Sequence, residues 1–159
     1  MERLTWVFKN LSALKPEELH ALYQLRTAIF VVEQACAYQE VDEHDLQSLH
    51  LLAWQGAELV ACARICPPHT VYQQASIGRV AVAENHRGQG LGRQVFQRAL
   101  NLSLERYPGQ ELKIQGQCYL EKFYHSFGFK TVSEPYPDWG IMHVDMIWPS
   151  NKDKSLRHV

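Results

Sequence analysis

Residues 77–92 read IGRVAVAENHRGQGLG, and the interpretation of the whole chain starts from this stretch. Its first part is rich in Val, Ile and Ala, which is typical of a strand, and we expect that strand over residues 75–82. Its second part carries glycines at alternate positions, Gly88, Gly90 and Gly92. Apolar residues recur at helical spacing after these glycines and predict a helix over residues 91–107 that packs on a sheet.

The glycine-rich turn indicates a binding site for phosphate or pyrophosphate. Alternating glycines let the backbone approach a ligand closely with its N–H groups turned inward. The helix N-terminus behind them adds partial positive charge, and Arg87 can add a full charge at the rim. A plain glycine-rich turn that caps a helix is the alternative interpretation.

Three ligand-binding motifs compete for this turn. A Walker loop is rejected because Leu91-Gly92-Arg93 follows Gly90 where Gly-Lys-Ser/Thr would be needed. A dinucleotide fingerprint is rejected because its third glycine is misplaced and the segment lies in the middle of the chain. The acyl-coenzyme A loop, Arg/Gln-x-x-Gly-x-Gly/Ala, is matched by Arg87, Gly90 and Gly92.

Length and composition fit one globular domain. The 159 residues are 46% hydrophobic and 21% charged, with a formal net charge of −1. We expect a single domain over residues 1–149 and a polar tail over 150–159. The balanced charge gives no global basic field for nucleic acid, and no apolar run reaches the length of a membrane span or a signal peptide. A cytoplasmic protein with no nucleic acid or membrane partner is expected.

The remaining pattern predicts an α/β (α+β) fold with a mixed, mostly antiparallel twisted sheet of six or seven strands flanked by about four helices. Residues 55–58 read as the turn of a hairpin, residues 138–140 as a second turn, and Gly128 as the cap of a short helix. Four reduced cysteines, buried or half-buried, are expected. The further predicted strands are 5–8, 50–54, 59–66, 112–117, 130–132 and 143–148, and the further helices are 16–30 and 120–127.

Several separated motifs resemble the GNAT superfamily of N-acetyltransferases. The first is Gly78-Arg79-Val80-Ala81-Val82 with the loop from Arg87 to Gly92, and the second is Phe123-Tyr124-His125-Ser126-Phe127-Gly128-Phe129. A third set is similar to the ElaA-type subgroup. It consists of Arg26, Phe30-Val31-Val32-Glu33-Gln34, Tyr38, Asp42, Asp45 and Asp138-Trp139-Gly140-Ile141-Met142-His143. The resemblance spans residues 5–148.

The resemblance implies acetyl-CoA as the co-substrate and a GNAT fold. The pantetheine arm would lie along the strand from Val80 to Val82, with a backbone N–H near Val82 as the oxyanion donor. Gln117 stands where many members carry an asparagine that contacts the pantetheine. The pyrophosphate would rest on the amides of Arg87, Gly88, Gln89, Gly90, Leu91 and Gly92.

The resemblance also implies that Tyr124 is the general acid that reprotonates the leaving thiolate. The general base is left open among Glu33, His143 and the acidic segment 40–45, either directly or through water. The acid content of that segment suits a cationic amine, and a solvated loop is the alternative. The polar residues from Asp42 to His50 lack the spacing of a metal site, so no metal is expected.

Taken together, these motifs and the resemblance predict an acyltransferase that moves an acetyl group from acetyl-CoA to a primary amine by direct attack. Direct transfer implies that Cys118 packs and does not act as a nucleophile. The acceptor would be a small-molecule or peptide amine of unidentified structure, and a homodimer is possible. A synthase of the acyl-homoserine-lactone type, a non-catalytic acyl-CoA sensor and a nucleotide-binding protein remain as alternatives.

Overall fold

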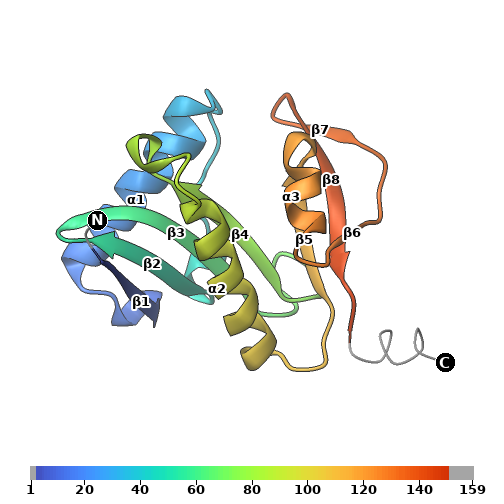
Figure 1. Ribbon diagram of the computed structural model, residues 1–159, viewed down its shortest axis with the longest axis horizontal. Helices are drawn as coiled ribbons and strands as arrows, with labels where there is room; N and C mark the ends of the chain where they lie inside the picture. The colour runs from blue at the N-terminus through green and yellow to red at the C-terminus, as the bar shows by residue number, and fades with distance from the viewer. Residues whose placement is uncertain (1–2, 151–159) are drawn as a thin grey trace.

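Two β-sheets lie side by side in the computed structural model, which describes residues 3–150 (Figure 1). Every pair of neighbouring strands within a sheet is antiparallel. The first sheet has the order β1 (Leu4–Asn10), β2 (Leu49–Gln55), β3 (Glu58–Cys66) and β4 (Ser76–Val82). The second has the order β5 (Leu112–Gln117), β8 (Ile141–Trp148) and β6 (Lys130–Thr131), with β7 (Tyr136–Asp138) also paired to β8.

The two sheets touch at one end of β4 and β5. A parallel bridge joins Ala75 to Leu112, and the Lys113 N–H donates to the Ala75 carbonyl at 3.0 Å. Beyond this bridge β4 and β5 are not paired, and Figure 1 shows them diverging. The predicted fold class is confirmed, but the described residues form eight strands in two sheets and not six or seven in one. The sequence analysis missed β7 because Pro135 and Pro137 are typical of a turn.

Three α-helices accompany the sheets within residues 3–150, against an expectation of about four: α1 (Pro16–Arg26), α2 (Leu91–Arg106) and α3 (Glu121–His125). The helix expected over 16–30 leaves α geometry after Arg26 and continues as the π-helical segment η2 (Thr27–Glu33). Its wider turn is visible in the bonds from the Gln34 N–H to the Ile29 carbonyl and from the Cys36 N–H to the Val31 carbonyl. No helix in the described part of the chain could span a membrane.

Two apolar clusters hold the first sheet between its helices. Leu22 and Ile29 of the α1 side pack with Leu52 and Cys62 on one face. On the other face α2 buries Val95, Phe96, Ala99 and Leu100. The Phe96 ring also contacts the rings of Phe123, Tyr124, Phe127 and Phe129, and thereby fixes α2 against α3 and the second sheet. The space between the diverging strands therefore has rigid walls.

The local signals at turns and cysteines agree with the structure. Gly56 and Gly128 adopt positive φ at the β2–β3 turn and behind α3. Cys36, Cys62 and Cys66 are buried and Cys118 is half-buried, and all four are free thiols. Of the predicted tail, residues 151–159 lie outside the described part of the chain.

Candidate active site

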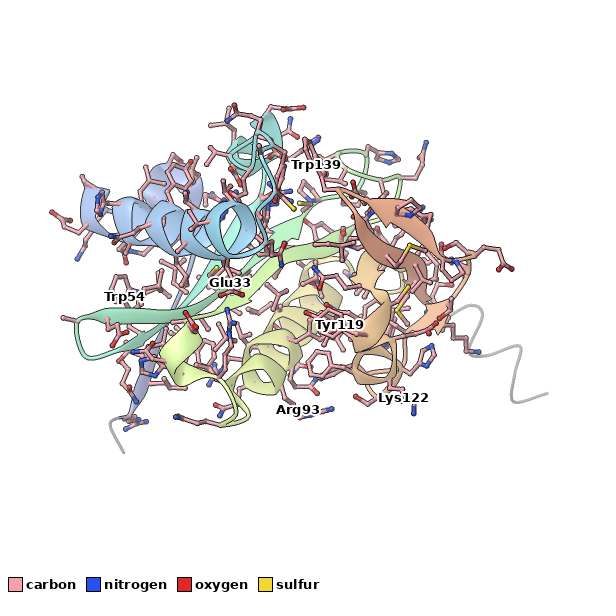
Figure 2. The ribbon with its side chains drawn as sticks, turned by 90° about the horizontal axis from the view of Figure 1, so that it is seen from above. Glu33, Trp54, Arg93, Tyr119, Lys122 and Trp139 are labelled. Atoms are coloured by element: carbon pink, nitrogen blue, oxygen red, sulfur yellow. The ribbon has the colours of Figure 1, made fainter. Side chains whose placement is uncertain are left out.

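A cavity of about 610 Å³ lies between the diverging strands β4 and β5. Its lining comes from both sheets, from η2 and from the head of α2. In Figure 2, Glu33 marks the η2 wall and Tyr119 the opposite wall, which leads into α3. The volume lies in the range of small-molecule and cofactor sites.

Most residues proposed from the sequence line this one cavity. They are Glu33, Val80, Val82, Arg87, Gly88, Gly90, Leu91, Gly92, Gln117, Tyr124 and His143. Gln89 is not in the lining, and neither is Cys118. The fold therefore brings together segments that lie far apart in the chain, although placement alone does not give any of these residues a role.

The glycine-rich loop presents free amides at the head of α2. Gly88 and Gly90 have φ values of 77° and 78°, in the left-handed region where glycine is preferred. In the described residues no atom lies within 4 Å of where a Cβ would stand at either glycine. No described backbone or side-chain group accepts from the amides between Gly88 and Arg93. An anionic group would find both room and donors here.

Arg87 is tied to the protein at the rim of this loop. Its Nη2 lies 3.0 Å from Glu33 Oε1, and its Nε donates to the Val82 carbonyl at 3.1 Å. Arg87 and Glu33 are both about two-fifths exposed, at 41% and 39%. The ion pair connects η2 to the loop and places Glu33 beside the predicted anion site. The negative charge of Glu33 is balanced by Arg87.

A β-bulge interrupts β4 where it lines the cavity. Cys62 pairs with Ala81 and Arg64 with Gly78, so two steps on β3 match three steps on β4. On β4, Arg79 and Val80 therefore stand opposite the single residue Ala63 of β3, and Arg79 has a φ of 50°. Such a bulge bends a strand. It also shifts the alternation of the backbone by one residue, so that N–H groups that would have faced one neighbouring strand face the other.

The reversal turns the Val82 amide toward the cavity. Before the bulge the Ala75 carbonyl faces β5, and after it the Ala83 N–H donates to the Val60 carbonyl of β3 at 2.8 Å. Because strand residues alternate sides, Val82 then directs its N–H away from β3 and toward the separated β5. A free strand edge of this kind can pair with an extended ligand.

Tyr124 stands on α3 with its ring against β5. Ring contacts with Phe96 and Phe123 hold it, and a Cβ at Gly116 would lie 3.0 Å from the ring carbons. Gly116 is therefore the residue that admits the ring, a requirement that the sequence analysis missed. Burial raises the pKa of Tyr124 to about 12, so the hydroxyl stays protonated at neutral pH.

His143 on β8 is buried, and its hydrogen bond determines its tautomer. Nδ1 lies 2.6 Å from the Ile141 carbonyl, and the ring stacks on Tyr136 at 6.4 Å between centroids. A carbonyl can only accept, so Nδ1 carries the proton in the neutral ring. Nε2 of that ring then keeps a lone pair that can take a proton.

The acidic segment is neither a solvated loop nor part of the cavity lining. Glu40 and Asp45 are buried, at 3% and 1% exposure. Asp45 receives two bonds from Arg26, at 2.9 and 3.0 Å, and Arg64 lies 2.7 Å from Asp42. Burial alone would raise the pKa of Asp45, but its bonds to Arg26 and Arg64 hold it below the ordinary value. These carboxylates neutralise arginines and do not present charge to a substrate.

Two further features of the site were not found from the sequence. The bulge places Arg79, a residue with a Cβ, at a positive φ where glycine would be preferred, so no local signal marks it. Asp138, quoted from the sequence as a turn residue and as part of the ElaA-type motif but not as a site residue, lines the cavity and accepts from Gln115 Nε2 at 3.0 Å. Within residues 3–150, no three His, Cys, Asp or Glu side chains gather in a way that could hold a metal ion.

Comparison with known proteins identifies the family. A model of the "Acetyltransferase (GNAT) domain" matches residues 11–149. Protein ElaA of Escherichia coli K12 is 40% identical over 145 residues, which cover 90% of this chain and 95% of ElaA. The crystal structure of an acyl-CoA N-acyltransferase from Pseudomonas aeruginosa superposes with a TM-score of 0.87 at 40% identity, covering 91% of this chain and 99% of that one.

More distant structures share only the fold. The acyl-homoserine lactone synthase BjaI superposes with a TM-score of 0.75 at 16% identity, covering 92% of this chain and 82% of that one. The predicted resemblance is confirmed by the closer matches. The chain belongs to the GNAT family of acetyltransferases, within the group that contains ElaA, and is thus an acyltransferase.

Proposed function

We propose that the protein transfers an acetyl group from acetyl-CoA to a primary amine by direct attack on the thioester. The observation that carries this proposal is the parted edge of β4 beside the free amides of the α2 head. That arrangement can hold a diphosphate at one end and an extended thioester arm along the strand. The residues proposed to hold the coenzyme are Val80, Val82, Arg87, Gly88, Gly90, Leu91, Gly92 and Gln117, with the Gln89 amide in the same loop.

The atoms balance in a single substitution at the carbonyl carbon. The amine nitrogen forms a bond to that carbon, the carbon–sulfur bond breaks, and coenzyme A leaves. The nitrogen gives up one proton and the sulfur is released as a thiolate or, after gaining a proton, as a thiol. The Val82 N–H is the proposed donor to the carbonyl oxygen as its charge grows.

Tyr124 is the proposed group at the leaving sulfur. A thiol has a pKa of about 8.5, well below the value of about 12 for the buried phenol. The hydroxyl therefore stabilises the departing thiolate chiefly by donating a hydrogen bond, which is a weaker role than full proton transfer. This refines the general-acid role inferred from the family resemblance.

His143 is the base that the geometry favours over Glu33. Nε2 of its neutral ring is available to take the proton from the amine, because Nδ1 is held by the Ile141 carbonyl. Glu33 is paired with Arg87 beside the loop. His143→Gln should lower kcat about tenfold or more, whereas His20→Gln on the exposed face of α1 should not. A larger loss in Glu33→Gln than in His143→Gln would assign the base to Glu33.

Asp138 supports a cationic acceptor. Among the described residues it is the cavity carboxylate that no cation neutralises, since Glu33 is paired with Arg87. The cavity arginines Arg64 and Arg79 are in turn neutralised by the acidic segment. The net charge that an incoming ammonium meets is therefore negative and is centred on β7.

Replacing Asp138 with asparagine should raise KM for the amine about tenfold, the usual size of a lost charged hydrogen bond. The KM for acetyl-CoA should stay the same. The effect should shrink as salt is raised, because the site is half-exposed. Glu134→Gln, on an exposed loop nearby, is the control. An unchanged KM for the amine would remove Asp138 from the acceptor site.

An acceptor screen tests the proposed function as a whole. Polyamines, amino acids, aminoglycosides and lysine peptides would each be mixed with acetyl-CoA and the protein, and release of the free thiol would be followed. Thiol release that depends on an amine, with an acetylated product, is the expected result. Binding of coenzyme A without thiol release from any amine would favour the non-catalytic sensor.

A further inference from the structure

A buried network of arginines and carboxylates adjoins the β4 bulge, and family membership gives it no role. We propose that Glu40, acting through Arg79, holds the bulge in the shape that turns the β4 amides toward the thioester. Both would be positioning residues. The inference rests on the proposed function, because it assumes that these amides serve acyl transfer.

The backbone of Arg79 needs external support. Its φ of 50° lies in the left-handed region, which disfavours residues that carry a Cβ. Arg79 takes this strained conformation although a glycine, Gly78, stands immediately before it in the chain. Strained backbone of this kind persists only where surrounding contacts determine it, and it is found at functional sites.

The Arg79 side chain supplies that support through Glu40. Its Nε donates to Glu40 Oε1 at 2.9 Å, and its Nη2 donates to the Glu40 carbonyl at 2.8 Å. The guanidinium also lies 5.7 Å from the centre of the Tyr38 ring. Two bonds to one residue fix the orientation of the planar guanidinium as well as its position.

Glu40 is itself immobilised from the opposite side. Arg26, at the end of α1, donates from Nε to the same Oε1 at 2.6 Å and from Nη2 to the same carbonyl at 3.3 Å. Arg26 is in turn held by both oxygens of Asp45. Glu40 is therefore bonded to α1 on one side and to the bulge on the other, so the position of α1 helps to set the position of β4.

The location of Glu40 makes it possible to distinguish a positioning role from a direct contact with substrate. Arg79 lines the cavity, so its loss could also remove a contact with substrate. Glu40 is buried and is not in the cavity lining. A kinetic effect of Glu40 on the chemical step would then be indirect, and the Arg79 variants distinguish a route through Arg79 from one through Arg26 and η2.

The test compares substitutions that separate backbone strain from the side-chain tie. Arg79→Gly relieves the strain but removes the tie, Arg79→Lys keeps the charge, and Glu40→Gln keeps the shape of the anchor. We expect kcat to fall about tenfold in Arg79→Gly and Glu40→Gln, as when a donor to the oxyanion is misplaced. Arg79→Lys should recover part of this loss. The Kd for coenzyme A should change by less than kcat does, because only the β4 contacts with the pantetheine arm are altered and the loop at the α2 head is untouched.

Lys9→Ala provides the control for loss of an ion pair, because it breaks the Lys9–Glu18 contact away from the cavity. It should alter neither constant. Amide hydrogen exchange of Ala83, whose N–H is bonded to the Val60 carbonyl just beyond the bulge, should also rise in Arg79→Gly, and this readout needs no acceptor. If Glu40→Gln fails to fold, Arg79→Gly carries the test, because Glu40 keeps its bond to Arg26 in that variant.

Two negative results have different meanings. If the wild type is active and Arg79→Gly changes neither kcat nor amide exchange, the positioning role is overturned and the proposed function stands. A wild type that binds coenzyme A but acetylates no amine would overturn the proposed function. Faster exchange at Ala83 in Arg79→Gly in that case would still show that the tie holds the bulge.

Discussion

Substituting Gly90 with glutamate should abolish binding of coenzyme A. Gly90 has a φ of 78° at the N-cap of α2, where a residue with a Cβ costs about 1–2 kcal/mol. The new carboxylate would stand in the open space beside the free amides and repel phosphate. We expect Kd to rise at least about a hundredfold, which corresponds to ~2.7 kcal/mol. Isothermal titration with coenzyme A measures it directly.

Gly109→Glu is the matched control for that experiment. Gly109 also has a positive φ, 72°, with open space around it, but it lies behind α2 and away from the cavity. It should lose a similar amount of stability and bind coenzyme A normally. Unchanged affinity in Gly90→Glu would mean that the loop at the α2 head is not the coenzyme site.

Removing the hydroxyl of Tyr124 should have the largest effect on turnover. Tyr124→Phe keeps the ring against Phe96 and Gly116, so the fold and the coenzyme Kd should be preserved. Loss of a hydrogen-bond donor at the leaving sulfur, where negative charge develops, is expected to lower kcat about a hundredfold. Steady-state thiol release, with the Kd measured in parallel, separates the chemical step from binding.

The raised pKa of Tyr124 adds a pH signature. The hydroxyl is the active form, and its pKa of about 12 means that it stays protonated well above neutral pH. Wild-type kcat should therefore show no loss from Tyr124 between about pH 7 and 10. Tyr107→Phe, outside the cavity, is the control and should behave as wild type. Unchanged turnover in Tyr124→Phe would leave Tyr124 with a packing role only.

Local patterns in the chain predicted much of the fold. The alternation and apolar spacing around residues 49–66 and 91–106 predicted β2, β3 and α2 within one or two residues, because neighbouring residues decide these elements. The glycine loop was found for the same reason, since positive φ at Gly88 and Gly90 favours glycine locally. The boundary of α1 was wrong because apolar residues continue at helical spacing through Ile29 and Phe30, whereas the backbone changes to π geometry at Thr27.

The candidate site was predicted in part. Family motifs named residues that the fold does bring into one cavity, but their chemical states depend on contacts between segments. The pKa of Tyr124 is raised by burial against other segments, and the pairing of Glu33 follows from an arginine 54 residues away. Charge counting in the acidic segment suggested a patch that attracts a cationic amine, whereas Arg26 and Arg64, which are buried, and the half-buried Arg79 neutralise it.

The amino-acid sequence by itself determined the family, the order of most strands and helices, and the loop whose backbone can receive an anion. These properties are encoded in short windows, through glycine, apolar periodicity and turn residues. Only the tertiary structure decided that β4 bulges at Arg79, that the two sheets part beyond Ala75, and that Asp138 is the unneutralised carboxylate of the cavity. Each of these depends on which distant charges and strand edges meet, and no local propensity encodes such long-range partners.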